Sequence, residues 1–137
     1  MDKVMWVTLD HKGKANIQIE ENPMRKRLYL AGPMRGIANF NFPAFHKAAA
    51  ILREEGYHVT SPAEEDEKNF GASAFTDPHG LTVYSEAFSL NDCLGADLDY
   101  ICNEADVVAV LPGWENSKGT KAEIATAEAL GLEIIYV

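Results

Sequence analysis

Asp97 is an acidic residue placed where a folded helix would turn it towards the protein interior. The segment 90–105 has apolar residues at helical spacing, and Asp97 lies three residues after Leu94 and four before Ile101, at the edge of that stripe. A carboxylate on the buried side of a helix costs free energy unless it is paired or used in chemistry. The spacing therefore indicates an acid–base group, with a partly exposed carboxylate at the stripe margin as the alternative.

Glu123 is a second acidic residue, and its spacing leaves two interpretations open. Thr120 and Glu123 match the T-x-x-E capping box, in which the glutamate only reaches back to a backbone amide. Ser117 is equally compatible with a simple helix cap. Glu123 also begins a predicted helix just after a central strand, which is where parallel α/β sheets bind their ligands.

The stretch GPMRG, residues 32–36, joins an apolar strand to a helix and has the composition of an anion-binding loop. Gly32 and Gly36 let the backbone approach a ligand, and Arg35 offers a planar set of donors suited to phosphate. Pro33 removes one amide donor, so the loop is neither a Walker loop nor a dinucleotide-binding fingerprint. The alternative is an ordinary strand-to-helix turn with a solvent-facing arginine.

These residues belong to a stretch of chain in which predicted strands alternate with helices. We predict strands over 27–32, 57–62, 106–113 and 132–137, and helices over 42–56, 90–105 and 120–131. Residues 64–86 lack clear periodicity and are expected to form a long loop, which can include a short helix. The alternation predicts an α/β fold with a parallel sheet covered on both sides. Ligands would then bind at loops 32–42, 61–88 and 111–120.

The first 26 residues differ from the rest of the chain. The segments VMWVTL and ANIQIE flank DHKGK, which predicts a β-hairpin with Gly13 in its turn, and ENPMRK is expected to be a linker. We therefore divide the chain into a hairpin and linker over 1–26 and an α/β domain over 27–137.

Composition limits the classes of partner. The 137 residues include 12 basic and 21 acidic side chains, for a net charge of −9, which argues against a nucleic-acid polymer as ligand but not against a nucleotide. No signal peptide or membrane-spanning run is apparent, so a soluble cytoplasmic protein without membrane contact is expected. Cys93 and Cys102 are interpreted as reduced thiols, and the histidines lack metal-ligand spacing, so no metal is predicted.

Taken together, the motifs resemble the nucleoside 2-deoxyribosyltransferase superfamily. The resemblance rests on YLAGPMRG followed by NFPAF, and on ADVVAVLPGWENSKGTKAE, in order across residues 27–137. It is closest to small uncharacterised proteins, many of them encoded by phages, and to the 2′-deoxynucleoside 5′-monophosphate N-glycosidases. It implies a flavodoxin-like, Rossmann-like three-layer sandwich.

The resemblance also implies roles for individual residues. Glu123 would be the nucleophile, Asp97 the second acid, and Tyr29 a tyrosine close to the nucleophile. Residues implied in holding a 5′-phosphate are Gly32, Met34, Arg35, Gly36, Ser117 and Gly119. Trp114, Asn39 and Phe40 are expected at the base or in a lid, with packing of Trp114 on its own loop or at a subunit contact as alternatives. Pro33 departs from the related hydrolases, which have a serine there, so one phosphate contact is missing.

The expected activity is hydrolysis of the N-glycosidic bond of a (2′-deoxy)nucleoside 5′-monophosphate through a covalent glycosyl-glutamate, without a cofactor. A carboxylate can trap the sugar cation, and a second acid can protonate the departing base. Base exchange and a non-catalytic nucleotide-binding regulator are the alternatives. A homodimer or higher homo-oligomer is expected, because the resemblance implies that Ser117 reaches the phosphate bound by a neighbouring subunit.

Overall fold

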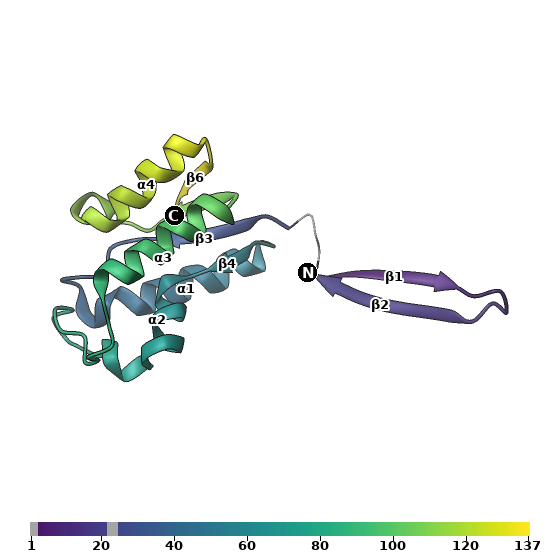
Figure 1. Ribbon diagram of the computed structural model, residues 1–137, viewed down its shortest axis with the longest axis horizontal. Helices are drawn as coiled ribbons and strands as arrows, with labels where there is room; N and C mark the ends of the chain where they lie inside the picture. The colour runs from purple at the N-terminus through teal and green to yellow at the C-terminus, as the bar shows by residue number, and fades with distance from the viewer. Residues whose placement is uncertain (1–2, 22–24) are drawn as a thin grey trace.

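The computed structural model describes residues 3–21 and 25–137. Its main sheet has four parallel strands in the order β4-β3-β5-β6 (Figure 1). The strands are β3 (Arg27–Ala31), β4 (His58–Thr60), β5 (Val107–Val110) and β6 (Glu133–Tyr136). The predicted parallel α/β fold is thereby confirmed.

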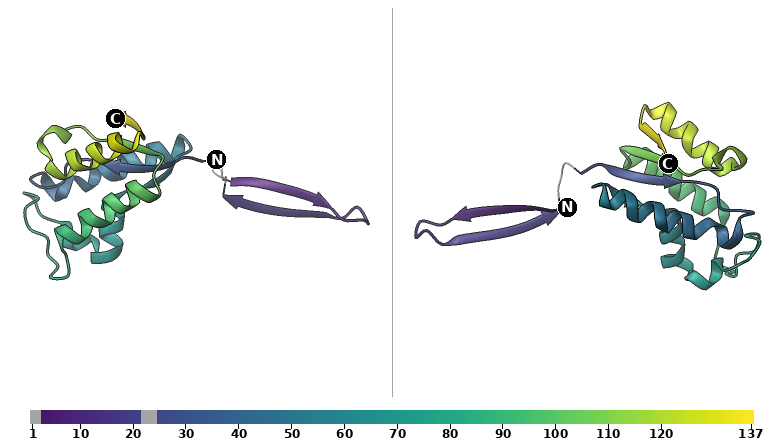
Figure 2. Two further views of the ribbon diagram at one scale, coloured as in Figure 1. Left: turned by 45° about the horizontal axis from the view of Figure 1, so that its top comes forward. Right: turned by 180° about the vertical axis from the view of Figure 1, so that it is seen from behind.

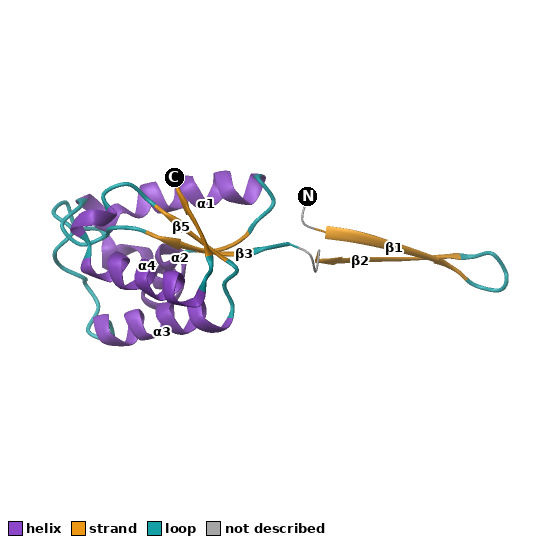
Figure 3. Cartoon of the chain, turned by 90° about the horizontal axis from the view of Figure 1, so that it is seen from above, coloured by secondary structure: helices purple, strands orange, loops and turns teal. Residues whose placement is uncertain are grey.

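Helices cover both faces of this sheet. They are α1 (Phe42–Glu54), α2 (Pro62–Phe70), α3 (Leu90–Asn103) and α4 (Lys118–Leu130), with 3-10 turns over Ala38–Asn41, Ala72–Phe75 and Trp114–Asn116. Figure 3 shows α1 on one side of the strands and α3 and α4 on the other. This is the three-layer arrangement that strand–helix alternation predicts.

Strand β3 shows how the sequence builds two cores at once. Leu28 and Leu30 belong to the core that α1 covers, whereas Tyr29 and Ala31 belong to the core under α3 and α4. Successive side chains of a strand point to opposite faces, so a central strand buried on both sides is apolar throughout. The same alternation turns Tyr29 towards α3 and α4.

Helix α2 lies in the segment that was predicted as a long loop. Its sequence, PAEEDEKNF, has almost no apolar residues, and only Pro62 and Ala63 are buried, so no helical hydrophobic period is visible. The boundary signals are present, with a proline in the first turn, Glu64 and Glu65 beside it, and Gly71 after the last residue. The prediction that the loop can include a short helix was therefore too cautious.

The N-terminal hairpin is formed as predicted. Strands β1 (Lys3–Leu9) and β2 (Ala15–Glu21) pair antiparallel, and the Asp10 carboxylate closes the turn by accepting from the amides of Lys12 and Lys14. Figures 1 and 2 show the hairpin extending away from the α/β unit. Residues 22–24 of the predicted linker lie outside the described residues. None of the helices within 3–21 and 25–137 is long and apolar enough to cross a membrane.

The order of the strands identifies the place where a ligand would bind. From β3 the chain passes to β4 on one side, and it later returns to β5 on the other side of β3. The carboxyl ends of β3 and β5 thus lie at a topological switch point, where open α/β sheets characteristically leave a crevice. The loops that follow these two strands contain GPMRG and the approach to α4.

Candidate active site

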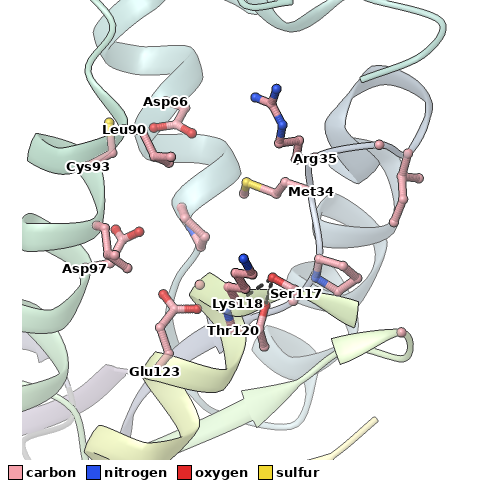
Figure 4. Close-up of a pocket in the computed structure, with 18 of the residues that line it drawn as sticks. Met34, Arg35, Asp66, Leu90, Cys93, Asp97, Ser117, Lys118, Thr120 and Glu123 are labelled. Carbon is pink, nitrogen blue, oxygen red and sulfur yellow. Dashed lines mark hydrogen bonds between the residues drawn. The ribbon is translucent and has the colours of Figure 1, made fainter. Parts of the chain in front are cut away.

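A cavity of about 760 Å³ lies at this switch point. It is bounded by the glycine loop after β3, by α2 and α3, and by the loop that leads from β5 into α4 (Figure 4). Its volume is in the range of pockets that hold small-molecule ligands. Polar groups that face it come from four elements of the chain: Tyr29, Arg35, Asp66, Asp97, Ser117, Lys118 and Glu123.

Tyr29 and Glu123 form the buried floor of this cavity. Their side chains are 1% and 6% exposed, and the Tyr29 hydroxyl donates a hydrogen bond of 2.5 Å to Oε2 of Glu123. The capping-box interpretation of Glu123 is wrong, because Ser117 is the N-cap of α4 and its hydroxyl accepts from the amide of Thr120. Glu123 instead lies one turn further along the helix and faces the cavity.

Burial changes the acidity of Glu123. Removal from water raises the pKa of its carboxyl to about 8, the negative charge of Asp97 adds to the rise, and the hydrogen bond from Tyr29 opposes it. Burial and the two neighbouring carboxylates raise the pKa of Tyr29 well above 10, so Tyr29 stays protonated and remains a donor. Glu123 is therefore a group that can be neutral or ionised near pH 7.

Asp97 lies on the neighbouring helix α3 and is half-buried, as the apolar spacing of that helix predicts. In Figure 4 the Asp97 and Glu123 carboxyl groups point into the same space from adjacent helices. Burial raises the pKa of Asp97 to about 6, against the effect of the Tyr29 hydroxyl, which lowers it. Two carboxyl groups in unlike surroundings can divide acid and base roles.

Asp66 is a third carboxylate of the cavity, and sequence reasoning did not select it. It projects from α2 and has no hydrogen-bond or ion-pair partner among the described residues. Burial, followed by the charges of Asp97 and Glu65, raises its pKa to about 7. The only sequence signal for Asp66 is an acidic run in a segment without hydrophobic periodicity. Such a run is typical of a solvent-exposed surface.

The N-terminus of α4 presents a hydroxyl group and a lysine to the cavity. The Ser117 hydroxyl accepts from the amide of Thr120 at 3.2 Å and from its hydroxyl at 2.9 Å. Since a serine oxygen has two lone pairs and one proton, these bonds leave the proton to donate to another group. Lys118 follows in the first turn and also lines the cavity, where the helix dipole adds positive potential. Lys118 was not predicted, although a lysine beside the cap serine was visible.

The glycine loop forms the opposite side of the cavity, with Arg35 and Met34 extending from it (Figure 4). A side chain at Gly32 would meet Leu111 at 2.7 Å, so this glycine permits the close packing of two strand ends. The amide of Gly36 already donates to the carbonyl of Gly80. Among the described residues, the amides of Met34 and Arg35 donate to no protein acceptor, which leaves them to a ligand.

Three residues expected at the base or in a lid lie outside the cavity lining. Phe40 is buried in the core against the edge of Phe75, because an aromatic ring here fills the space beside α1. The amide of Asn39 donates to the Asp77 carbonyl. Trp114 packs on Tyr136 of β6, with ring centroids 5.8 Å apart. Contacts within the chain thus explain the positions of the Phe40 and Trp114 rings, whereas the Asn39 side chain is exposed. Gly119 and Met34 do line the cavity.

The fold and this cavity define a parallel α/β protein with a carboxylate-rich pocket at its switch point. A family profile matches residues 26–136, and the chain belongs to that family, which is described as a domain of unknown function (DUF4406). No curated protein matches the chain.

Proposed function

We propose that this protein hydrolyses the N-glycosidic bond of a (2′-deoxy)nucleoside 5′-monophosphate, as the resemblance to the deoxyribosyltransferase superfamily implies. The observation that supports this most is the buried carboxyl group of Glu123, held by Tyr29 and facing Asp97 in one cavity. Arg35 and Lys118 give the same cavity two cationic side chains that an anion can use. A nucleoside monophosphate would fit this arrangement, with its sugar beside the carboxyl groups and its phosphate beside the cationic side chains.

The carboxylate of Glu123 would attack C1′ of the sugar. As the C1′–O bond forms, the C1′–N bond breaks and its electron pair leaves with the base, which takes a proton from the carboxyl group of Asp97. Water then attacks C1′ and releases Glu123 as a carboxylate, while the proton from that water returns to Asp97. Tyr29 positions Glu123 and stays protonated throughout. No cofactor is needed, because every proton and electron pair is accounted for.

In the protonation state that can react, Glu123 and Asp97 together carry one proton. Glu123 must be ionised to attack and Asp97 must be protonated to donate, whereas the raised pKa values of about 8 and about 6 favour the reverse distribution. Both protonation states have the same total charge and interconvert by moving one proton. The active state is therefore a minor population in equilibrium with the dominant state. The positive charge that develops at C1′ as the base departs favours the ionised form of Glu123.

The 5′-phosphate would lie between the glycine loop and the start of α4. Its ligands are the Arg35 guanidinium, the free amides of Met34 and Arg35, and the Ser117 hydroxyl, with Lys118 nearby. Holding a remote phosphate fixes C1′ over the nucleophile, and binding energy distant from the reacting bond then lowers the barrier. All these groups line one cavity of a single chain. The contribution of Ser117 to the phosphate of a neighbouring subunit, which the resemblance implies, stays a prediction.

The test is a screen of ribo- and deoxyribonucleoside monophosphates, modified bases included, with chromatographic detection of free base and sugar phosphate. We expect at least one substrate to release both products in equal amounts. Glu123→Gln should abolish release while still binding the nucleotide. Glu128→Gln is the matched control, because Glu128 lies on the same helix but is exposed and outside the cavity.

Other outcomes separate the rival activities. Base release that requires a second free base, with a new nucleotide as product, would identify a transferase. A nucleotide that binds tightly and is recovered unchanged from the wild-type protein would identify a regulator. Full turnover in Glu123→Gln would contradict the nucleophile.

A further inference from the structure

The hairpin of residues 3–21 has one apolar face that no other described residue of the chain covers. In the β1–β2 register Met5 lies opposite Ile19, Val7 opposite Ile17, and Leu9 opposite Ala15. Directly opposed residues share a face, so these three pairs form a continuous apolar band. The other face is mixed, with Trp6, Thr8, Asn16 and Gln18.

The exposure of this band is unusual for a folded domain. Its five large side chains, on both strands, are between 57% and 69% exposed. A two-stranded hairpin alone in water is marginally stable, and it becomes stable when its apolar face packs against another surface. The α/β unit of the same chain does not supply that surface, because the hairpin extends away from it (Figure 2). Every described side chain from 5 to 19 is exposed. The described part of the chain therefore leaves the band open to another molecule.

Charge identifies the kind of molecule that fits. Residues 3–21 contain three lysines, two glutamates and one aspartate, so the hairpin has no net charge. Residues 25–137 carry 9 basic and 17 acidic side chains, so two α/β units repel each other. A second hairpin meets the first without repulsion and with the same apolar band. A twofold axis through the central Val7–Ile17 pair would satisfy both bands at once.

The hairpin also leaves the α/β unit at the amino end of β3, opposite the cavity at the carboxyl ends of the strands (Figure 1). Contact between hairpins therefore keeps the acidic units apart and both cavities open. We propose that the hairpin is a self-association arm, in which the apolar band packs face to face against the same band of a second copy of this chain. This inference is independent of the proposed catalytic function.

The experiment measures mass by sedimentation equilibrium over concentrations from about 1 to about 200 µM, since association follows mass action. The wild-type chain of 137 residues should reach twice its 15.1 kDa mass. The double variant Val7→Lys with Ile17→Glu puts a cross-strand ion pair into the band and keeps the net charge unchanged. It should remain at 15.1 kDa over the whole range. Leu9→Lys with Ala15→Glu tests the same band at its end next to the turn and should behave alike.

The matched control is Thr8→Lys with Asn16→Glu, which places the same opposed pair of charges on the other face of the hairpin. This control should dimerise like the wild type. A wild-type chain that stays monomeric at every concentration would overturn the proposal and would assign the band to a different partner. A dimer that survives both band variants would place the interface elsewhere. If the control loses the dimer to the same extent, dimerisation depends on an intact hairpin and not on the apolar band, which contradicts the proposal.

Discussion

The hydroxyl of Tyr29 on the first strand of the main sheet donates to the carboxyl group of Glu123 on the last helix, 94 residues later in the chain. This bond joins the two core elements on which the proposed chemistry depends. Because both groups are buried, the bond orients Glu123 in a place where its charge is poorly solvated. The consequences can be measured in stability and in activity.

The first prediction concerns stability against pH. The folded-state pKa of Glu123, about 8, is above its ordinary value of 4.5, so unfolding allows the group to ionise more easily. Its contribution to stability is therefore fully present below about pH 4.5 and is lost as pH rises through about 8. Glu123→Gln removes this loss and should be more stable than wild type by about 2–4 kcal/mol at pH 9, with little difference at pH 4. Urea denaturation of both proteins at each pH measures the difference, and a constant difference would contradict the raised pKa.

The second prediction is a bell-shaped dependence of turnover on pH. Below about pH 6 both acids are protonated and no nucleophile is present, whereas above about pH 8 both are ionised and no proton donor is present. Activity should therefore be maximal between these values. In Asp97→Asn the residual activity should lose its alkaline limb, because only Glu123 then titrates. An alkaline limb that persists in Asp97→Asn would assign the proton donor to another group, such as Asp66.

The third prediction separates the role of Asp97 from a structural one. Asp97→Asn should slow natural nucleotides far more than analogues whose base leaves without protonation, by about 10²- to 10⁴-fold for the natural ones. Asp99→Asn on the same helix is the control, because Asp99 is exposed and faces away from the cavity. Comparing kcat for the two kinds of substrate decides the matter. Equal losses for both would point to misfolding or to a binding role.

The fourth prediction concerns the phosphate. A charge-assisted hydrogen bond contributes about 1.5–3 kcal/mol, so Arg35→Ala should lower kcat/KM for a monophosphate by about ten- to a hundredfold. The corresponding nucleoside should be a poor substrate and should be unaffected by the change. Lys47→Ala removes the same charge from an exposed position on α1 and should leave kcat/KM unchanged. If Arg35→Ala affects nucleoside and monophosphate equally, Arg35 does not bind the phosphate.

The fifth prediction concerns the support of the glycine loop. Gly80 has a φ of +62°, and a side chain there would lie 2.0 Å from the carbonyl oxygen of Ile37. Gly71 also has a positive φ, +86°, but a side chain there would meet nothing within 4 Å. Gly71→Ala should therefore cost about 1–3 kcal/mol of stability for its backbone alone, and Gly80→Ala should cost more, because the clash with Ile37 adds to the backbone cost. Urea denaturation compares them, and equal costs would show that the two loops do not depend on their contact.

The fold was predictable because its signals are local. Apolar strands, helices with an apolar face, and the glycine-containing connections repeat in an order that only a covered parallel sheet satisfies. The hairpin was equally clear from two apolar runs around a turn. The position of helix α2 was not predicted. A helix that buries only Pro62 and Ala63 shows no hydrophobic periodicity in its sequence.

The site was predictable where an apolar context made a polar residue conspicuous. Asp97 stands out beside the stripe of α3, and it does line the cavity. Asp66 and Lys118 belong to polar stretches that are typical of solvent-exposed surface. Only the packing of α2 and of the start of α4 shows that both residues line the cavity. Trp114 was conspicuous as an aromatic residue in a loop, but its ring packs against the ring of Tyr136.

The sequence by itself determined the succession of strands and helices along the chain except for α2, the hairpin, and the candidate acids Asp97 and Glu123, because each of these follows from residue type and spacing along a short stretch of chain. Tertiary structure alone decided that Glu123 is not a capping-box residue and that it contacts Tyr29. Helix capping and contact with Tyr29 are both compatible with the same spacing, and they differ only in which group lies nearest in space. Acidity was decided in the same way, since the raised pKa values of Glu123, Asp97 and Asp66 come from burial and from each other's charges, neither of which is a property of a residue alone.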